Sequence, residues 1–241
     1  MKIEIIHELA DKWKTELSID AMYYHASRQA HERAQRAKIL VNQAEKRWSR
    51  LEEKWNSIEK KHRKHQTEAY DDLEPISIQM EDAHYEIGKA YGALLKEVAV
   101  VHILSTAALE AHINSIAKET LVGKMYKSFE KLSLETKWLF LPKMLNLHGF
   151  EPGKQPFQNF SKLIRYRDKL IHYKSIQEPW IQGTVPEFIK NIGLTIADSE
   201  RSILTAAGMI RALSRIREVE PPFWLRSDLN KINYFELADQ K

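Results

Sequence analysis

The strongest constraint on the fold is a stretch, residues 20–94, in which apolar residues recur every three or four positions. Its first half carries the seam Ala30, Ala34, Ala37, Val41, Ala44, Trp48, Leu51, Trp55 and Ile58. A polar loop over residues 65–75 precedes a second seam: Ile76, Met80, Ala83, Ile87, Ala90 and Leu94. Because steps of three and four place side chains on one helix face, and a short loop joins antiparallel neighbours, residues 20–94 are predicted to form a long helical hairpin.

Helical spacing also dominates the rest of the chain, and few segments alternate in the manner of a β-strand. Further helices are predicted over residues 3–17, 76–121, 124–131, 137–147, 156–173 and 185–217, with the clearest loop at 149–156. The single chain 1–241 is therefore predicted to be all-α, with a bundle core at residues 95–217. The tail at 218–241 is expected to pack back because it contains Phe223, Trp224, Leu225, Tyr234 and Phe235.

The composition of the chain excludes several classes of function. The net charge of +4 permits nucleic-acid binding without requiring it. The absence of cysteine excludes disulfides, thiolate metal sites and cysteine nucleophiles. No signal-peptide pattern is evident, and the most apolar run, residues 98–109, is too short to span a bilayer, so we expect a cytoplasmic protein without a membrane partner. No phosphate-binding loop, nucleophile elbow or metalloprotease helix is present, and no cofactor or metal is expected.

One short segment on the predicted helix 156–173 contains side chains that could bind a phosphate and transfer protons. Arg167 can hold a phosphate with its planar donors, and His172 can transfer protons near neutral pH. Asp168 and His172 are four residues apart, so the carboxylate could accept from the imidazole, and Arg165 could pair with Asp168. Arg167 and His172 are five residues apart, about 140° around a regular helix. They would converge only if the helix ends at His172 or if two copies face each other.

The same residues have a simpler interpretation. With ten histidines in the chain, an arginine followed by a histidine at this distance is expected by chance. An exposed Arg–Asp pair on a helix usually contributes well under about 1 kcal/mol to stability. Spacing alone is therefore compatible with two interpretations of these residues, a catalytic site and a structural ion pair.

Two segments resemble elements of the HEPN superfamily. Residues 167–172, Arg-Asp-Lys-Leu-Ile-His, resemble its signature of an arginine, a polar residue, a spacer and a histidine on a late helix. Residues 109–114, Leu-Glu-Ala-His-Ile-Asn, resemble the core helix that precedes the motif helix in many members. Glu110 and Asn114 share a face there, although a structural polar pair would give the same pattern. The resemblance covers about residues 94–217 and does not extend to the hairpin.

The resemblance implies a four-helix core that dimerises and places two motifs in one cleft. Many members are metal-independent endoribonucleases, so Arg167 would bind the phosphate, His172 would act as general acid or base, and Asp168 would orient or polarise. The supporting polar residues would be Glu110, Asn114, Arg165 and Tyr173. The expected role is a toxin or antiviral defence component with RNA as substrate. Other members only bind nucleotides or partners, and the subgroup with a tyrosine two residues after the histidine is not supported, because position 174 is lysine.

Two further features leave alternatives open. Lys60, Lys61, Arg63 and Lys64 form a basic cluster at the hairpin tip, which could touch an RNA backbone or simply be a solvated helix end. His102 and His112 are expected to be buried and hydrogen-bonded. The alternative function is a non-catalytic, HEPN-like interaction or nucleotide-binding protein whose hairpin docks a partner, such as a cognate antitoxin.

Overall fold

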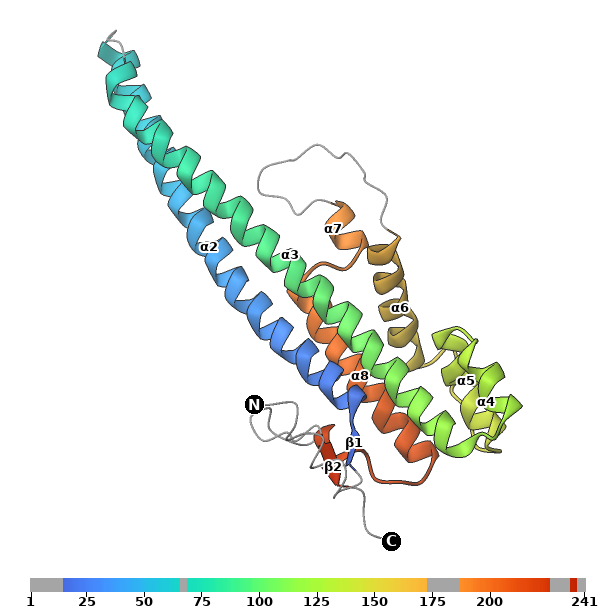
Figure 1. The fold of residues 1–241 in the computed structure, drawn as a ribbon. Coiled ribbons are helices and arrows are strands. Elements are labelled where there is room, and N and C mark those ends of the chain that lie inside the picture. Colours follow the sequence, from blue (N-terminus) through green and yellow to red (C-terminus); the bar gives the residue numbers. More distant parts are fainter. Residues whose placement is uncertain (1–14, 66–68, 173–186, 226–234, 238–241) are drawn as a thin grey trace. The chain divides into compact units, whose positions relative to one another are not determined.

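The fold is all-α, and the described residues include one pair of three-residue strands (Figure 1). The computed structural model describes residues 15–65, 69–172, 187–225 and 235–237. Its elements are β1 (Thr15–Leu17), α2 (Ile19–His65), α3 (Tyr70–Thr120), α4 (Lys124–Glu130), α5 (Leu134–Met144), α6 (Phe157–Ile171), α7 (Glu187–Asn191), α8 (Ile196–Ile216), η1 (Phe223–Leu225) and β2 (Phe235–Leu237). The chain forms two compact units, residues 30–98 and the remainder.

The unit at residues 30–98 contains most of the hairpin that was predicted over residues 20–94. The seam residues are buried on both helices, from Ala30, Ala34 and Val41 on α2 to Ala83 on α3. Towards the tip, Trp48, Trp55, Ile58 and Met80 pack around the cluster of Leu51, Ile76 and Ala83. The seam therefore forms as the heptad spacing predicts.

The second hairpin helix begins earlier than predicted. Pro75 was expected to end the loop, but α3 begins at Tyr70 and contains this proline in its second turn. Asp71 and Asp72 lie in the first turn, where negative charge favours the helix N-terminus. Since only one backbone donor is missing this close to the end, the helix tolerates the proline.

The other unit is a helical bundle in which α6 packs against α8 (Figure 1). The part of α3 in this unit supplies buried residues on several sides, including Val101, Leu109 and Ile113. His102 of α3 bonds through Nδ1 to the Ser202 hydroxyl of α8 and through Nε2 to the Gly193 carbonyl, each at 2.8 Å. The prediction of a buried, hydrogen-bonded His102 is confirmed, and these bonds fix α3 to α8.

An aromatic cluster joins α5 to α6. Trp138 of α5 is fully buried, with its ring centroid 5.8 Å from those of both Phe150 and Phe160. The helix α5 begins at Leu134 rather than near residue 137, because Ser133 caps it by accepting from the backbone N–H of Thr136. The cluster gives α6, which carries the sequence motif, a firmly buried face.

The helix predicted over residues 185–217 is two helices. Gly193, with φ of 72°, separates α7 from α8, and Thr195 caps α8 by accepting from the Asp198 N–H. A Cβ on Gly193 would lie 2.5 Å from the Tyr166 ring. The continuous-helix prediction is wrong here because close packing and a left-handed backbone both require glycine.

The ends of the chain form the short strand pair. Residues 15–17, predicted as the end of a helix, are β1, which pairs antiparallel with β2; most of the predicted helix 3–17 lies outside the described residues. In the tail, Trp224 and Leu225 are buried. Since no sequence-local signal links residue 15 to residue 237, this pairing is a tertiary feature.

Within the part of the chain that the structure describes, one helix, α3, is long and apolar enough by length and composition to cross a membrane. Half of its most apolar window is buried within the protein. The central helix of a folded bundle has the same character, so the apolar run is accounted for by the core.

Candidate functional site

The sequence motif lies at the C-terminal end of α6. Phe157, Phe160, Leu163 and Tyr166 form the buried face of this helix, and the Tyr166 hydroxyl donates to Asp198 of α8 at 3.0 Å. The last helical residue is Ile171, and His172 is the C-cap, with φ of −104° and ψ of 24°. The motif histidine is therefore exposed and stands where the helix geometry ends.

The end of the helix changes which motif residues meet. Nη1 of Arg167 donates to Oδ1 of Asp168 at 2.9 Å, and both side chains are partly exposed. In the described part of the chain, the Asp168 carboxylate forms no bond to the His172 ring or to Arg165. The expected pairings of Asp168 with His172 and with Arg165 are therefore not formed, because His172 has left the helical register and Arg167 occupies the carboxylate.

An open hollow of about 560 Å³ lies beside this end of α6. We call it the α6 hollow. Its lining residues are Glu135, Ser161, Ile164, Arg165, Asp168, Lys169 and His172. It gathers three potentially cationic side chains and two carboxylates around one surface. Arg167 does not line it and is connected to it only through Asp168.

The predicted Glu110–Asn114 element does not reach the motif. Oε1 of Glu110 lies 3.4 Å from Nζ of Lys137, a lysine that is 3% exposed. Oδ1 of Asn114 is buried and has no hydrogen-bond partner among the described residues. Neither side chain lines the α6 hollow, and Tyr173, the remaining predicted supporting residue, lies outside the described residues.

The basic cluster belongs to the hairpin unit. Lys60, Lys61, Arg63 and Lys64 are all exposed on the last turns of α2. Arg63 pairs with Glu59 at 3.0 Å, and His62 lies 2.8 Å from Asp72. Trp48 and Trp55 pack against the seam and are partly buried, so only part of each ring is accessible to a base.

A second polar group of residues was not predicted as a site. Nδ1 of His112 lies 2.8 Å from Oδ2 of Asp20, and both side chains are largely buried. Burial alone would raise the pKa of Asp20, but the hydrogen bond and charge of His112 outweigh it, so this pKa lies below its ordinary value. The expectation of a buried, hydrogen-bonded His112 is confirmed. Its partner was missed because Asp20 is 92 residues away in the chain.

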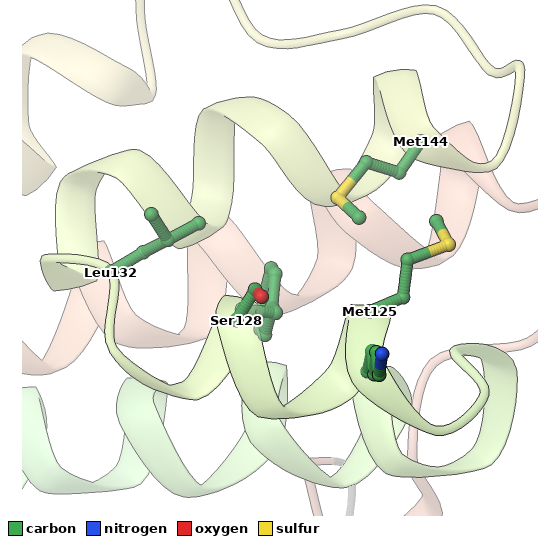
Figure 2. Close-up of a pocket in the computed structure, with 6 residues that line it drawn as sticks. Met125, Ser128, Leu132 and Met144 are labelled. Carbon is green, nitrogen blue, oxygen red and sulfur yellow. The ribbon is translucent and has the colours of Figure 1, made fainter.

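Another hollow lies between α4 and α5 and is mainly apolar. Met125 and Met144 extend toward each other across it, with Ser128 and Leu132 alongside (Figure 2). Phe129 and Lys124 complete the lining. This surface offers no acid–base pair, since thioethers and aliphatic groups do not move protons.

No group of three or more metal-ligating carboxylates, histidines or cysteines occurs within the described ranges. Comparison of this chain with protein-family models, with curated proteins and with solved structures found no match. The candidate site is therefore argued from its own residues alone. These are an arginine–aspartate pair and an exposed histidine at the end of a helix in an all-α protein.

Proposed function

We propose that this protein is a metal-independent endoribonuclease whose site is completed when two copies bring their α6 ends together. The observation that carries this proposal is the end of α6 at His172. Because His172 is the C-cap and is exposed, its ring lies outside the helical hydrogen-bond pattern and can reach an external substrate. This is the position that a general acid or base requires.

The chemistry follows from RNA itself. The 2′-hydroxyl attacks the adjacent phosphorus, the bond from phosphorus to the 5′-oxygen breaks, and the products carry a 2′,3′-cyclic phosphate and a 5′-hydroxyl. His172 would take the proton from the 2′-hydroxyl or give one to the leaving oxygen. Arg167 would hold the phosphate oxygens, whose charge grows in the transition state. Asp168, 2.9 Å from Arg167, would keep the guanidinium in position before substrate binds.

The dimer supplies what one copy lacks. Within a copy, His172 lines the α6 hollow and Arg167 does not, so a complete site would combine His172 of one copy with Arg167 of the other. Arg165 and Lys169 would hold neighbouring phosphates, and Lys60, Lys61, Arg63 and Lys64 would attract the strand by charge. In this proposal the enzyme is a cytoplasmic toxin or antiviral component.

The test is cleavage of single-stranded RNA by the full chain in EDTA. We expect 2′,3′-cyclic phosphate ends and at least a roughly 100-fold loss of rate in Arg167→Ala and His172→Ala. Lys127→Ala, an exposed lysine on α4, is the matched control. Intact RNA with the wild-type protein, or cleavage by both variants at the wild-type rate, would exclude this function.

A specific surface on the hairpin favours a second candidate, the docking of a protein partner. Trp48, Trp55, Met80 and Tyr85 line an open hollow of about 640 Å³, together with Glu52, Asn56, Ser77, Glu81 and His84. Aromatic and methionine side chains beside carboxylates would suit a partner helix with apolar and basic residues, such as an antitoxin. Loss of co-purification of a neighbouring gene product with Tyr85→Ala, while RNA cleavage is retained, would support it.

A further inference from the structure

A polar hollow separate from the α6 hollow lies around the Asp20–His112 pair. We call it the Asp20 hollow, and its volume is about 610 Å³. The start of α2, the end of α3, α4 and the segment after α8 contribute to it. Its lining residues are Ser18, Ile19, Asp20, Ala111, His112, Asn114, Ser115, Ile116, Lys118, Glu119, Tyr126, Arg217, Pro222, Phe223 and Trp224.

The His112 ring is held in one orientation. Its centroid lies 6.4 Å from that of Trp138, which is stacked, and 6.4 Å from that of Trp224, which is edge-on. An ionised Asp20 can only accept, so Nδ1 of His112 carries the proton and donates it. The other ring nitrogen, Nε2, has no hydrogen-bond partner within the described part of the chain. A polar atom on a ring fixed by two tryptophans and a carboxylate is therefore left for an external group.

Asn114 supplies a second unused polar atom. Asn114 lies two residues after His112 on α3, and both residues line the Asp20 hollow. Oδ1 of Asn114 is buried with no partner among the described residues. A buried acceptor without a donor is costly to stability, and an incoming N–H group would satisfy it.

Charge and aromatic surface complete the hollow. Arg217 and Lys118 provide cationic groups, while Glu119 and the Asp20 carboxylate provide negative charge. The Asp20 carboxylate is already bonded to His112 and to the Ser18 hydroxyl. Phe223 is 50% exposed at this hollow, so a planar group could contact its ring.

We propose that the Asp20 hollow binds a nucleoside phosphate. Asn114 would accept from an amino group of the base, the Phe223 ring would contact the base plane, and Arg217 with Lys118 would bind the phosphate. Nε2 of His112 would hydrogen-bond the ligand between these ends. The ligand is either a free mononucleotide or the terminal nucleotide of an RNA strand. The proposal is independent of RNA cleavage at α6.

The test is isothermal titration calorimetry of the full chain with AMP, using ribose 5-phosphate, adenosine and inorganic phosphate as partial ligands. We expect AMP to bind more tightly than any of the three. Asn114→Leu and Arg217→Ala should each weaken AMP binding roughly 10-fold or more, because each removes one contact to the ligand. Lys127→Ala and His172→Ala should leave the affinity unchanged, which separates this site from the α6 hollow.

Thermal unfolding distinguishes lost binding from lost folding. Without ligand, Asn114→Leu should melt at the wild-type temperature or above it, since it removes an unsatisfied buried acceptor. A clear fall in melting temperature would overturn the assignment of Asn114. The proposal also fails if AMP produces no heat at millimolar concentration, or if inorganic phosphate binds as tightly as AMP.

A 5′-phosphorylated oligoadenylate identifies the source of the ligand. Tighter binding of the oligonucleotide than of AMP, weakened by Asn114→Leu and Arg217→Ala, would indicate a strand terminus, and tighter binding of AMP would indicate a free nucleotide. Both results support the hollow as a nucleoside phosphate site. AMP binding that is unaffected by Asn114→Leu and Arg217→Ala would place the nucleotide elsewhere and contradict the proposal.

Discussion

Nδ1 of His112 donates a hydrogen bond to Oδ2 of Asp20 at 2.8 Å, and this contact ties the start of α2 to α3. The carboxylate also accepts from the Ser18 hydroxyl and from the Ala21 backbone N–H. Both side chains of the pair are largely buried. The pair therefore stabilises the bundle as well as lining the Asp20 hollow.

We predict that Asp20→Asn lowers the free energy of unfolding at pH 7 by about 2 kcal/mol, since it removes a charged acceptor from a buried hydrogen bond. The pKa of Asp20 is lowered in the folded protein, so this stabilisation is complete above the unfolded pKa, near 3.8. It is lost as the pH falls through the folded pKa. Denaturant unfolding of both proteins from pH 7 to pH 2 should show the difference shrinking below about pH 4. A difference that persists at pH 2 would contradict this.

A second pH effect is expected from His25. Burial is the main reason that its pKa falls to about 4, and its ring lies 5.3 Å from Tyr24 and 6.1 Å from Trp224, between centroids. The unfolded chain binds a proton below pH 6.5 while the folded one does not, so stability falls as the pH decreases from 6.5 towards 4. We expect this slope, about 1.4 kcal/mol per pH unit for one group, to disappear in His25→Phe. An identical slope in both proteins, measured by urea unfolding, would show that other groups cause it.

The break between α7 and α8 gives a stability prediction with an internal control. Gly193→Ala should destabilise by about 2–3 kcal/mol, because φ is 72° and the new Cβ would meet the Tyr166 ring. Gly208→Ala, in the interior of α8 with nothing within 4 Å of its Cβ position, should instead stabilise by about 0.5–1 kcal/mol. Thermal unfolding followed by circular dichroism checks both signs. Equal effects of the two substitutions would refute the close packing at Gly193.

The proposed composite site predicts complementation between inactive variants. Mixed dimers of Arg167→Ala and His172→Ala would contain one intact site, so refolding an equal mixture should restore about a quarter of wild-type activity. Each variant alone should remain inactive. An equal mixture of Arg167→Ala with the Arg167→Ala, His172→Ala double variant is the control and should stay inactive. Failure of the first mixture to recover activity would place any site within one copy.

Much of the fold follows from local sequence. The heptad spacing of Ala30, Ala34 and Val41 predicts one hairpin helix, and that of Ile76 and Ala83 the other, because helical periodicity is read directly from neighbouring residues. The start of α3 was misplaced, and the break at Gly193 was missed. The local signal is weak at both positions, a proline near a helix end in one case and a lone glycine in the other. The surrounding structure determines whether the helix continues there.

The candidate site was predictable only in part. Arg167, Asp168 and His172 stand out as residue types, but their pairing depends on α6 ending after Ile171. Sequence reasoning expected Asp168 to meet His172, whereas the carboxylate pairs with Arg167. The two residues of the Glu110–Asn114 element likewise have separate surroundings. Glu110 accepts a hydrogen bond from Lys137, whereas the buried Oδ1 of Asn114 has no partner among the described residues.

The sequence by itself determined that the chain is helical, where its long hairpin lies and which residues could carry acid–base chemistry. Those properties depend on spacing within a few turns. Only the tertiary structure decided that Asp20 meets His112, that His102 meets Ser202 and that residues 15–17 pair with residues 235–237. Such contacts join distant segments, and they form only where burial and packing of the whole bundle outweigh the entropy of closing a long loop.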